Sequence, residues 1–227
     1  MRKIRILSGT MKKTLIIFTF VLSTLFMQNN LAQGIGELAP PKPPETFPSN
    51  SWGVDIMVGD AGFGLGTFYR KQLDLKWTAF ADISFAETKD EREFEYIDFW
   101  GNVYTVGKKN RVFQAPINFG IHYRVFENTI ADNLRPYLSA GVGPTVIITT
   151  PYKEEFFNSF GKAQAKYALG GYLGLGANFG LDKSSLIGIN VRYYYSKILN
   201  GGVESLEGRE KTEIQGFFIT LNLGLMY

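Results

Sequence analysis

The sequence predicts an all-β protein, an eight-stranded antiparallel transmembrane β-barrel. Three observations predict this fold: eight stretches of alternating polarity follow one another from residue 51 onward, their connections alternate in length, and aromatic residues lie at the ends of the stretches. Glycine (25 residues) and aromatic residues (15%) are abundant, and aromatic residues favour strands. The chain has no cysteine, which excludes disulfides, thiolate metal sites and a cysteine nucleophile.

The first segment, residues 1–33, reads as a signal peptide. A positive start at Lys12 and Lys13 precedes an apolar run of 13 residues and a small, polar end. This is the layout of a secretory signal, and the run is shorter than the about 20 residues of a transmembrane helix. We expect cleavage at about Ala32/Gln33 and export from the cytoplasm.

A proline-rich segment, residues 34–50, follows the signal peptide. Five of the nine prolines lie between Pro40 and Pro48, and such a segment favours an extended polyproline conformation over a sheet. We expect a periplasmic linker there and the barrel in residues 51–227. The leader holds five basic residues and no acid, so the remaining chain has 24 − 5 = 19 basic and 21 acidic residues, a net charge of −2. Nucleic acid, which needs a basic patch, is therefore not an expected partner.

Each of the eight stretches has about the length of a tilted strand that crosses a bilayer. The stretches are Trp52–Gly59, Leu65–Gln72, Trp77–Ala86, Arg111–Phe126, Pro136–Ile148, Ala168–Gly180, Leu186–Ser196 and Ile214–Tyr227. Each alternates between an apolar face and a face of glycine, amide and single charges. In the last stretch the apolar face consists of Phe217, Ile219, Leu221, Leu223, Leu225 and Tyr227.

Two kinds of barrel fit this alternation. A soluble sandwich or lipocalin-like barrel turns the apolar face inward, whereas a membrane barrel turns it toward lipid. The polar face here lacks the lysine and glutamate coat of a soluble surface. Six aromatic residues lie on the apolar face near strand ends, where interface girdles occur: Trp52, Trp77, Tyr123, Tyr193, Tyr195 and Tyr227. These features favour the membrane barrel.

The connections predict the topology. Short ones fall at 73–75, 127–135 and 181–185, and longer ones at 87–110, 149–166 and 199–213, with a brief one at 60–64. With both termini in the periplasm, the short connections are periplasmic turns and the others are extracellular loops. An even number of strands closes the sheet without a free edge.

The end of the chain resembles the C-terminal signal that the barrel-assembly machinery recognises in outer-membrane barrels, with apolar residues at alternating positions and the terminal aromatic Tyr227. Arg135–Thr145, Gln114–Val125 and Gly188–Ser196 resemble the outer membrane protein β-barrel domain family, the small eight-stranded barrels of the OmpX/OmpW-like set. The resemblance covers about Trp52 to Tyr227 and implies the bacterial outer membrane. It is weak for function, because this family serves many roles.

The narrow interior of an eight-stranded barrel is filled by side chains, so its buried charges must be paired. We expect Asp82 and Arg192 near mid-membrane, with Arg70, Arg124 and Asp55 closer to the periplasm. This polar network would plug the lumen, while an ion pathway is the alternative. The expected network is Asp55, Arg70, Asp82, Asn118, His122, Arg124, Asn190, Arg192, Tyr194 and Asn222.

No chemistry-bearing motif stands out. His122 is the one histidine. Lipid A deacylases, which this chain resembles in length and strand count, use a histidine and a serine on one strand. Here no serine follows two residues after His122. No calcium or zinc spacing occurs, so we expect neither catalytic residues, nor a metal, nor a cofactor. Pro116 and Pro144 each remove a ladder donor, and we expect a β-bulge at each.

The sequence therefore predicts a non-enzymatic outer-membrane protein, structural or surface-binding through its extracellular loops. A narrow OmpW-like conduit for small apolar or ionic solutes is the alternative, and a lipid-modifying barrel enzyme is the third hypothesis. The expected partners are outer-membrane lipid and lipopolysaccharide, and the barrel-assembly machinery during insertion. We expect a monomer.

Overall fold

The structure is a computed structural model that describes residues 47–60, 62–90, 92–97, 99–100, 103–127, 130, 133–180 and 183–227. These residues lie in one unit, Pro44–Tyr227. The expected signal peptide and residues 34–46 of the expected linker lie outside the described residues. Within the described part of the chain, no helix is long and apolar enough to span a membrane.

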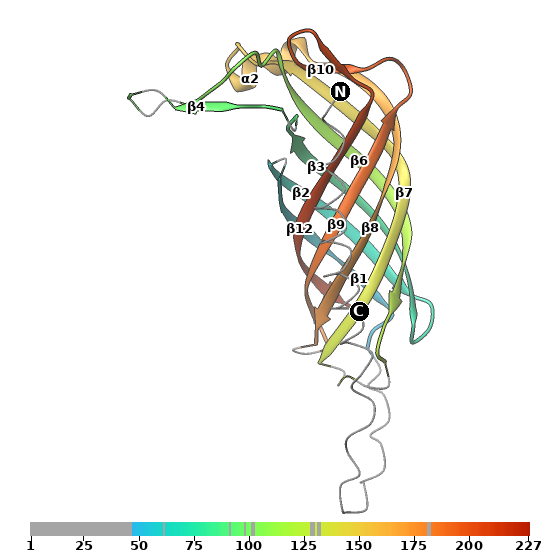
Figure 1. Ribbon diagram of the computed structural model, residues 1–227. Helices are drawn as coiled ribbons and strands as arrows, with labels where there is room; N and C mark the ends of the chain where they lie inside the picture. Colours follow the sequence, from blue (N-terminus) through green and yellow to red (C-terminus); the bar gives the residue numbers. More distant parts are fainter. Residues whose placement is uncertain are drawn as a thin grey trace, which may run out of the picture. The chain divides into compact units, whose positions relative to one another are not determined.

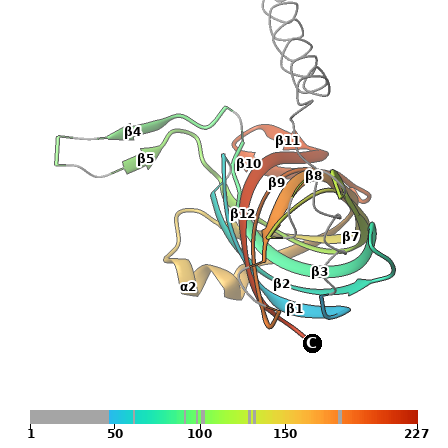
Figure 2. The ribbon, with the colours of Figure 1, turned by 90° about the horizontal axis from the view of Figure 1, so that it is seen from below.

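Eight long strands form a closed antiparallel barrel, as the sequence predicts (Figures 1 and 2). Around the barrel the order is β1-β12-β9-β8-β7-β6-β3-β2, so each strand pairs with its neighbours among the long strands along the chain and β12 returns to β1. The long strands are β1 (Asn50–Gly59), β2 (Gly62–Gln72), β3 (Trp77–Thr88), β6 (Asn110–Arg124), β7 (Leu134–Pro151), β8 (Gln164–Phe179), β9 (Ser185–Ile198) and β12 (Glu213–Met226).

The last strand closes the sheet. Trp52 of β1 lies opposite Leu225 of β12, and Phe217 of β12 lies opposite Tyr193 of β9. Tyr227, just beyond β12, exchanges two backbone hydrogen bonds with Asn50, of 2.9 and 3.1 Å between N and O. Residues 213–225 of β12 are therefore paired with β9, and residues 218–226 with β1.

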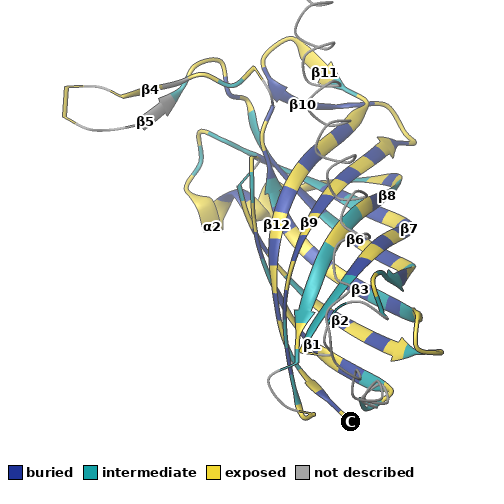
Figure 3. Ribbon diagram, turned by 60° about the horizontal axis from the view of Figure 1, so that its bottom comes forward, coloured by how far each residue is buried: buried dark blue, intermediate teal, exposed yellow. Residues whose placement is uncertain are grey.

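Burial alternates along the strands with the apolar side chains outside (Figure 3). In β12 the outward Phe217 is 55% exposed, whereas the inward Phe218 is fully buried. Five of the six aromatic side chains expected at strand ends are exposed on the outer surface: Trp52, Trp77, Tyr193, Tyr195 and Tyr227. Tyr123, the sixth, is half-buried, and its ring packs against Trp77 at 4.8 Å between centroids.

The two ends of the barrel differ. The turn end carries the start of β1, the end of β12 and the short connections 73–76, 125–133 and 180–184. The loop end carries the small elements: the hairpin of β4 (Glu95–Ile97) and β5 (Val103–Thr105), the short helices α2 (Phe156–Ser159) and η1 (Phe160–Lys162), and the hairpin of β10 (Val203–Leu206) and β11 (Arg209–Lys211). Short and long connections thus alternate as predicted, with the expected exception of the brief β1–β2 connection at the loop end, between Gly59 and Gly62.

The expected bulges at Pro116 and Pro144 are wrong. The register keeps a constant offset across both prolines: Pro116 lies opposite Thr145, and Phe119 lies opposite Val142. A one-residue shift would turn every later side chain to the other face, whereas β6 keeps Gln114, Asn118 and His122 all buried. Each proline lacks the backbone N–H that would donate a hydrogen bond between the strands, but neither strand contains an extra, unpaired residue there.

Glycine allows close approach beside Pro144. A Cβ atom on Gly143 would lie 1.8 Å from the carbonyl oxygen of Ile117 on the neighbouring strand. At this distance the two strands cannot keep their separation with any larger residue.

We therefore expect Gly143→Ala to lower the free energy of unfolding by about 1–3 kcal/mol through overpacking. Urea unfolding of the barrel in detergent micelles measures it. Gly161→Ala is the matched control, because a Cβ atom there meets nothing within 4 Å. Equal stability of both variants would contradict the close approach.

Candidate functional site

The inward faces of β1, β2, β3, β6, β8, β9 and β12 carry polar side chains that form networks in the lumen. Nine of the ten residues expected there are buried, and Arg124 is half-buried at the turn end. The structure divides them into a central network around Arg192 and a second group near the turn end that includes Arg70, His122 and Arg124.

Arg192 of β9 lies at the centre of the network. Its Nη2 donates to Asp55 Oδ2 at 3.0 Å, and its Nη1 lies 3.6 Å from Asp82 Oδ2. Its Nε donates to Asn190 Oδ1 at 2.8 Å, and its Nη1 also contacts the Tyr194 hydroxyl at 3.3 Å. The side chains of Arg192, Asp55 and Asp82 are at most 2% exposed, so one buried guanidinium neutralises two buried carboxylates only in part.

Amides and a phenol complete the coordination of the two carboxylates. Asp82 accepts from Asn118 Nδ2 at 2.8 Å and from the Tyr172 hydroxyl at 3.0 Å. Asp55 accepts from Asn222 Nδ2, and Asn222 in turn accepts from Asn190 Nδ2 at 2.8 Å. Hydrogen bonds of this kind offset the desolvation of buried charge. The expected position of Asp55 beside Arg70 and Arg124 is wrong, because it pairs with Arg192.

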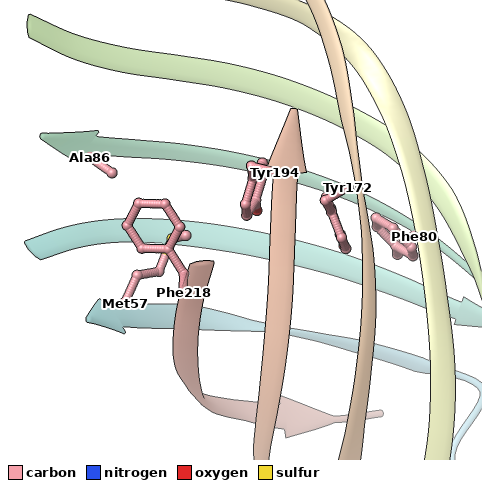
Figure 4. Packing of buried hydrophobic residues seen from close by; sticks show 6 residues of the cluster. All are labelled: Met57, Phe80, Ala86, Tyr172, Tyr194 and Phe218. Carbon is pink, nitrogen blue, oxygen red and sulfur yellow. The ribbon is translucent and has the colours of Figure 1, made fainter. Parts of the chain in front are cut away.

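Aromatic rings fill the lumen around this network (Figure 4). Phe80, Tyr172, Tyr194 and Phe218 form a row in which neighbouring ring centroids lie 4.9–5.8 Å apart. Arg192 itself lies over the Tyr172 ring at 4.9 Å. Met57 and Ala86 belong to the same cluster.

A second, apolar layer closes the lumen toward the loop end. It consists of Val112, Ile147, Ala168, Ile198, Val203 and Ile214, all buried. Five of these come from barrel strands, while Val203 comes from β10. Sequence reasoning missed this layer. Its signal was present, since the inward face turns from polar to apolar near the loop-end termini of β6, β7, β8, β9 and β12.

Above this layer, polar and charged side chains of two loops contact one another. We call this group the loop-end cluster, and it consists of Asp90, Glu93, Lys108, Ser205 and Lys211. Lys108 Nζ donates to Glu93 Oε2 at 2.9 Å with both side chains 4% exposed, and Ser205 Oγ donates to Glu93 Oε1 at 2.7 Å. Lys211 Nζ lies 3.3 Å from Asp90. Burial raises the pKa of Glu93, but the hydrogen bonds from Lys108 and Ser205 outweigh it and hold the pKa below its ordinary value.

A polar hollow of about 550 Å³ opens at the loop end. Its charged lining residues are Lys109, Lys162, Lys166, Glu204, Arg209 and Glu210. Lys109 pairs with Glu204, and Lys166 donates to the carbonyl of Gly202. The volume lies within the range of small-molecule sites.

The His122 ring packs against the rings of Phe80 and Tyr137, with 4.6 and 4.4 Å between ring centroids. Ser139 of β7 lies opposite it, but its buried Oγ makes no hydrogen bond. The contact that would let a histidine activate a serine is therefore not formed. Among the described residues, no three His, Asp or Glu side chains gather into a metal-binding group.

Among solved structures, the chain is similar to Neisserial surface protein A, with 11% identity, a TM-score of 0.47 and coverage of 81% of this chain and 100% of that chain. It is also similar to Ail, the attachment invasion locus protein of Yersinia pestis (14%, 0.42, 81% and 99%), and to the outer membrane protein OprG of Pseudomonas aeruginosa (15%, 0.39, 82% and 99%). No protein-family model and no curated protein matches the chain. The closed eight-stranded barrel of this chain agrees with the resemblance seen in its sequence.

The central network predicts an order of stabilities. Arg192→Met leaves two buried carboxylates without a cation, so we expect it to cost about 3–5 kcal/mol of unfolding free energy. Asp82→Asn should cost less, because Arg192 keeps Asp55. Arg209→Met, at an exposed loop position, is the control. Urea unfolding in micelles measures all three, and a smaller loss for Arg192→Met than for Asp82→Asn would refute the shared-cation arrangement.

The loop-end cluster predicts a dependence on pH. Because the pKa of Glu93 is lowered from 4.5 in the folded protein, its contribution is fully present above about pH 4.5 and disappears as the pH falls through the lower folded value. The amide of Lys109, which donates to Ser205 at 2.8 Å, should then lose protection from hydrogen exchange, after correction for the intrinsic rate. Glu93→Gln should produce the same loss at pH 6, while the Tyr227 amide at the turn end stays protected in both experiments. Undiminished protection of Lys109 at pH 3 would contradict this role.

Proposed function

We propose that the protein is a non-enzymatic outer-membrane barrel that acts at the cell surface through its loop end. The outer surface supports membrane insertion, because in the closed barrel every strand pairs with two neighbours, and exposed aliphatic side chains are stable against lipid. In this placement the turn end faces the periplasm and the loop end faces outward.

The paired charges and packed rings inside the barrel are the observation that supports the proposal. Below the loops lies the apolar layer, and below that lies the central network with its aromatic row. Water and ions would have to displace paired charges and packed rings to pass. A barrel closed at two levels supports binding at its ends rather than conduction through it.

The loop end offers binding features of two kinds. On the connection that carries the β4–β5 hairpin, Phe99 is 96% and Trp100 is 83% exposed, and large exposed apolar side chains often mark interaction sites. The polar hollow adds charged groups of both signs. We propose lipopolysaccharide and outer-membrane lipid as partners, since they present acyl chains and charged sugars together.

Assembly follows from the same chain. The outward face of β12, with Phe217, Ile219, Leu221, Leu223 and Leu225 followed by Tyr227, supports recognition by the barrel-assembly machinery. A signal peptide in residues 1–33 would deliver the protein to it. Since the barrel closes within one chain, we propose a monomer.

Two measurements on the folded full-length barrel test the proposal. In planar bilayers we expect no steady single-channel current, with insertion verified by the heat-dependent shift of mobility in gel electrophoresis. The double variant Phe99→Ser, Trp100→Ser should bind vesicles that contain lipopolysaccharide roughly fivefold more weakly or worse. Phe126→Ser, which removes an exposed phenylalanine at the turn end, should bind like the wild type. Steady open channels together with unchanged vesicle binding would overturn the proposal in favour of a conduit.

A further inference from the structure

A second cavity lies at the turn end and has an unusual charge. It is half-enclosed, with a volume of about 80 Å³, and residues of all eight barrel strands line it. The lining includes Arg70, Lys76, Arg124 and Arg135 together with His122. Among the described residues, no aspartate or glutamate lines it.

Arg70 of β2 is the group that distinguishes this cavity. It is 3% exposed, and its Nη1 donates to Asn178 Oδ1 at 3.2 Å. Its Nη2 is buried and has no hydrogen-bond partner. The guanidinium lies over the Phe68 ring at 4.1 Å, but no carboxylate of the described residues pairs with it. Arg192, by contrast, pairs with two carboxylates, those of Asp55 and Asp82.

A buried guanidinium with an unused donor is costly, and such exceptions in folded proteins call for a partner. Other cations at the cavity already engage neighbours: Lys76 Nζ lies 3.7 Å from Glu127, and the Arg135 guanidinium stacks on Phe47 at 3.8 Å. These side chains add positive potential without supplying an acceptor to Arg70. An anion that enters the cavity would supply both charge and acceptor.

We propose that this cavity is a binding site for a phosphate group, with Arg70 as its buried donor. A single water needs about 10–15 Å³ of such space, so about 80 Å³ admits a group of several heavy atoms. The planar fork of arginine donates in pairs to phosphate oxygens. The phosphate comes either from solution at the turn end, which is the periplasm in the orientation proposed above, or from the headgroup of a lipid at the membrane surface.

The first test is the melting temperature of the full-length barrel in neutral detergent micelles. Inorganic phosphate, titrated against chloride at constant ionic strength, should raise the melting temperature in a saturable manner, because a ligand that binds only the folded state stabilises it. Arg70→Gln should weaken phosphate binding roughly tenfold or more, since it removes a charge-assisted donor pair. Arg92→Gln, which removes the same charge at an exposed loop position outside both cavities, should bind like the wild type.

A second variant keeps the test decisive if Arg70→Gln does not fold. Ser51 lies opposite Arg70 in the β1–β2 register and is buried. Ser51→Asp therefore places a carboxylate beside the guanidinium, where an opposite charge across two strands stabilises the pair. This variant should melt at a higher temperature than the wild type without phosphate, and phosphate should no longer raise it.

Micelles doped with phosphatidylglycerol identify the source of the phosphate. A shift with inorganic phosphate assigns the site to a free anion, and a shift with the lipid alone assigns it to a headgroup; both support the site if Ser51→Asp abolishes the shift. The proposal is overturned if neither probe stabilises the wild type. It is equally overturned if the shift persists undiminished in Arg70→Gln or in Ser51→Asp.

Discussion

The structure depends on the pairing of its last strand with its first. In hydrocarbon an unpaired backbone N–H or C=O costs several kcal/mol, because no water is available to replace its partner. The ladder between β12 and β1 runs from Ser51 to Gly59 and removes the two edges that an open eight-stranded sheet would leave. With the edges gone, the outer face can be apolar throughout.

Closure with eight strands also fixes what the interior can be. A barrel of this size has room for side chains and little else, so charged inward residues need partners within the protein. Arg192 meets this constraint by contacting Asp55 and Asp82 together, with asparagine and tyrosine side chains taking the remaining hydrogen bonds. Arg70 pairs with no carboxylate of the described residues, and its Nη2 has no hydrogen-bond partner. The charge at the turn end is therefore less compensated than the charge at the centre of the lumen.

The fold could be predicted from the sequence because apolar and polar residues alternate along each strand, which shows that one face meets an apolar surrounding and the other a polar interior. The inward residues were identified on the same basis. The sequence also places Asp82 and Arg192 together near mid-membrane, and they lie 3.6 Å apart. The partner of Asp55 was missed, because β1 and β9 are distant in the chain and the stagger between such strands is not encoded in either of them. Val203 and the pair Glu93–Lys108 lie in loops without periodicity. At Pro116, the missing donor suggested a bulge, but the need to keep Asn118 and His122 inward preserved the register.

The most direct test of this account is a nitroxide scan along β12 in lipid bilayers. Labels at outward positions Phe217, Ile219 and Leu221 should be accessible to oxygen dissolved in the bilayer, and labels at the inward positions Phe218, Thr220 and Asn222 should be inaccessible both to oxygen and to a water-soluble paramagnetic reagent. This alternation with a protected inner face is the result that a closed, filled barrel predicts. Access of the water-soluble reagent to Thr220 and Asn222 would contradict it, because water would then fill the lumen.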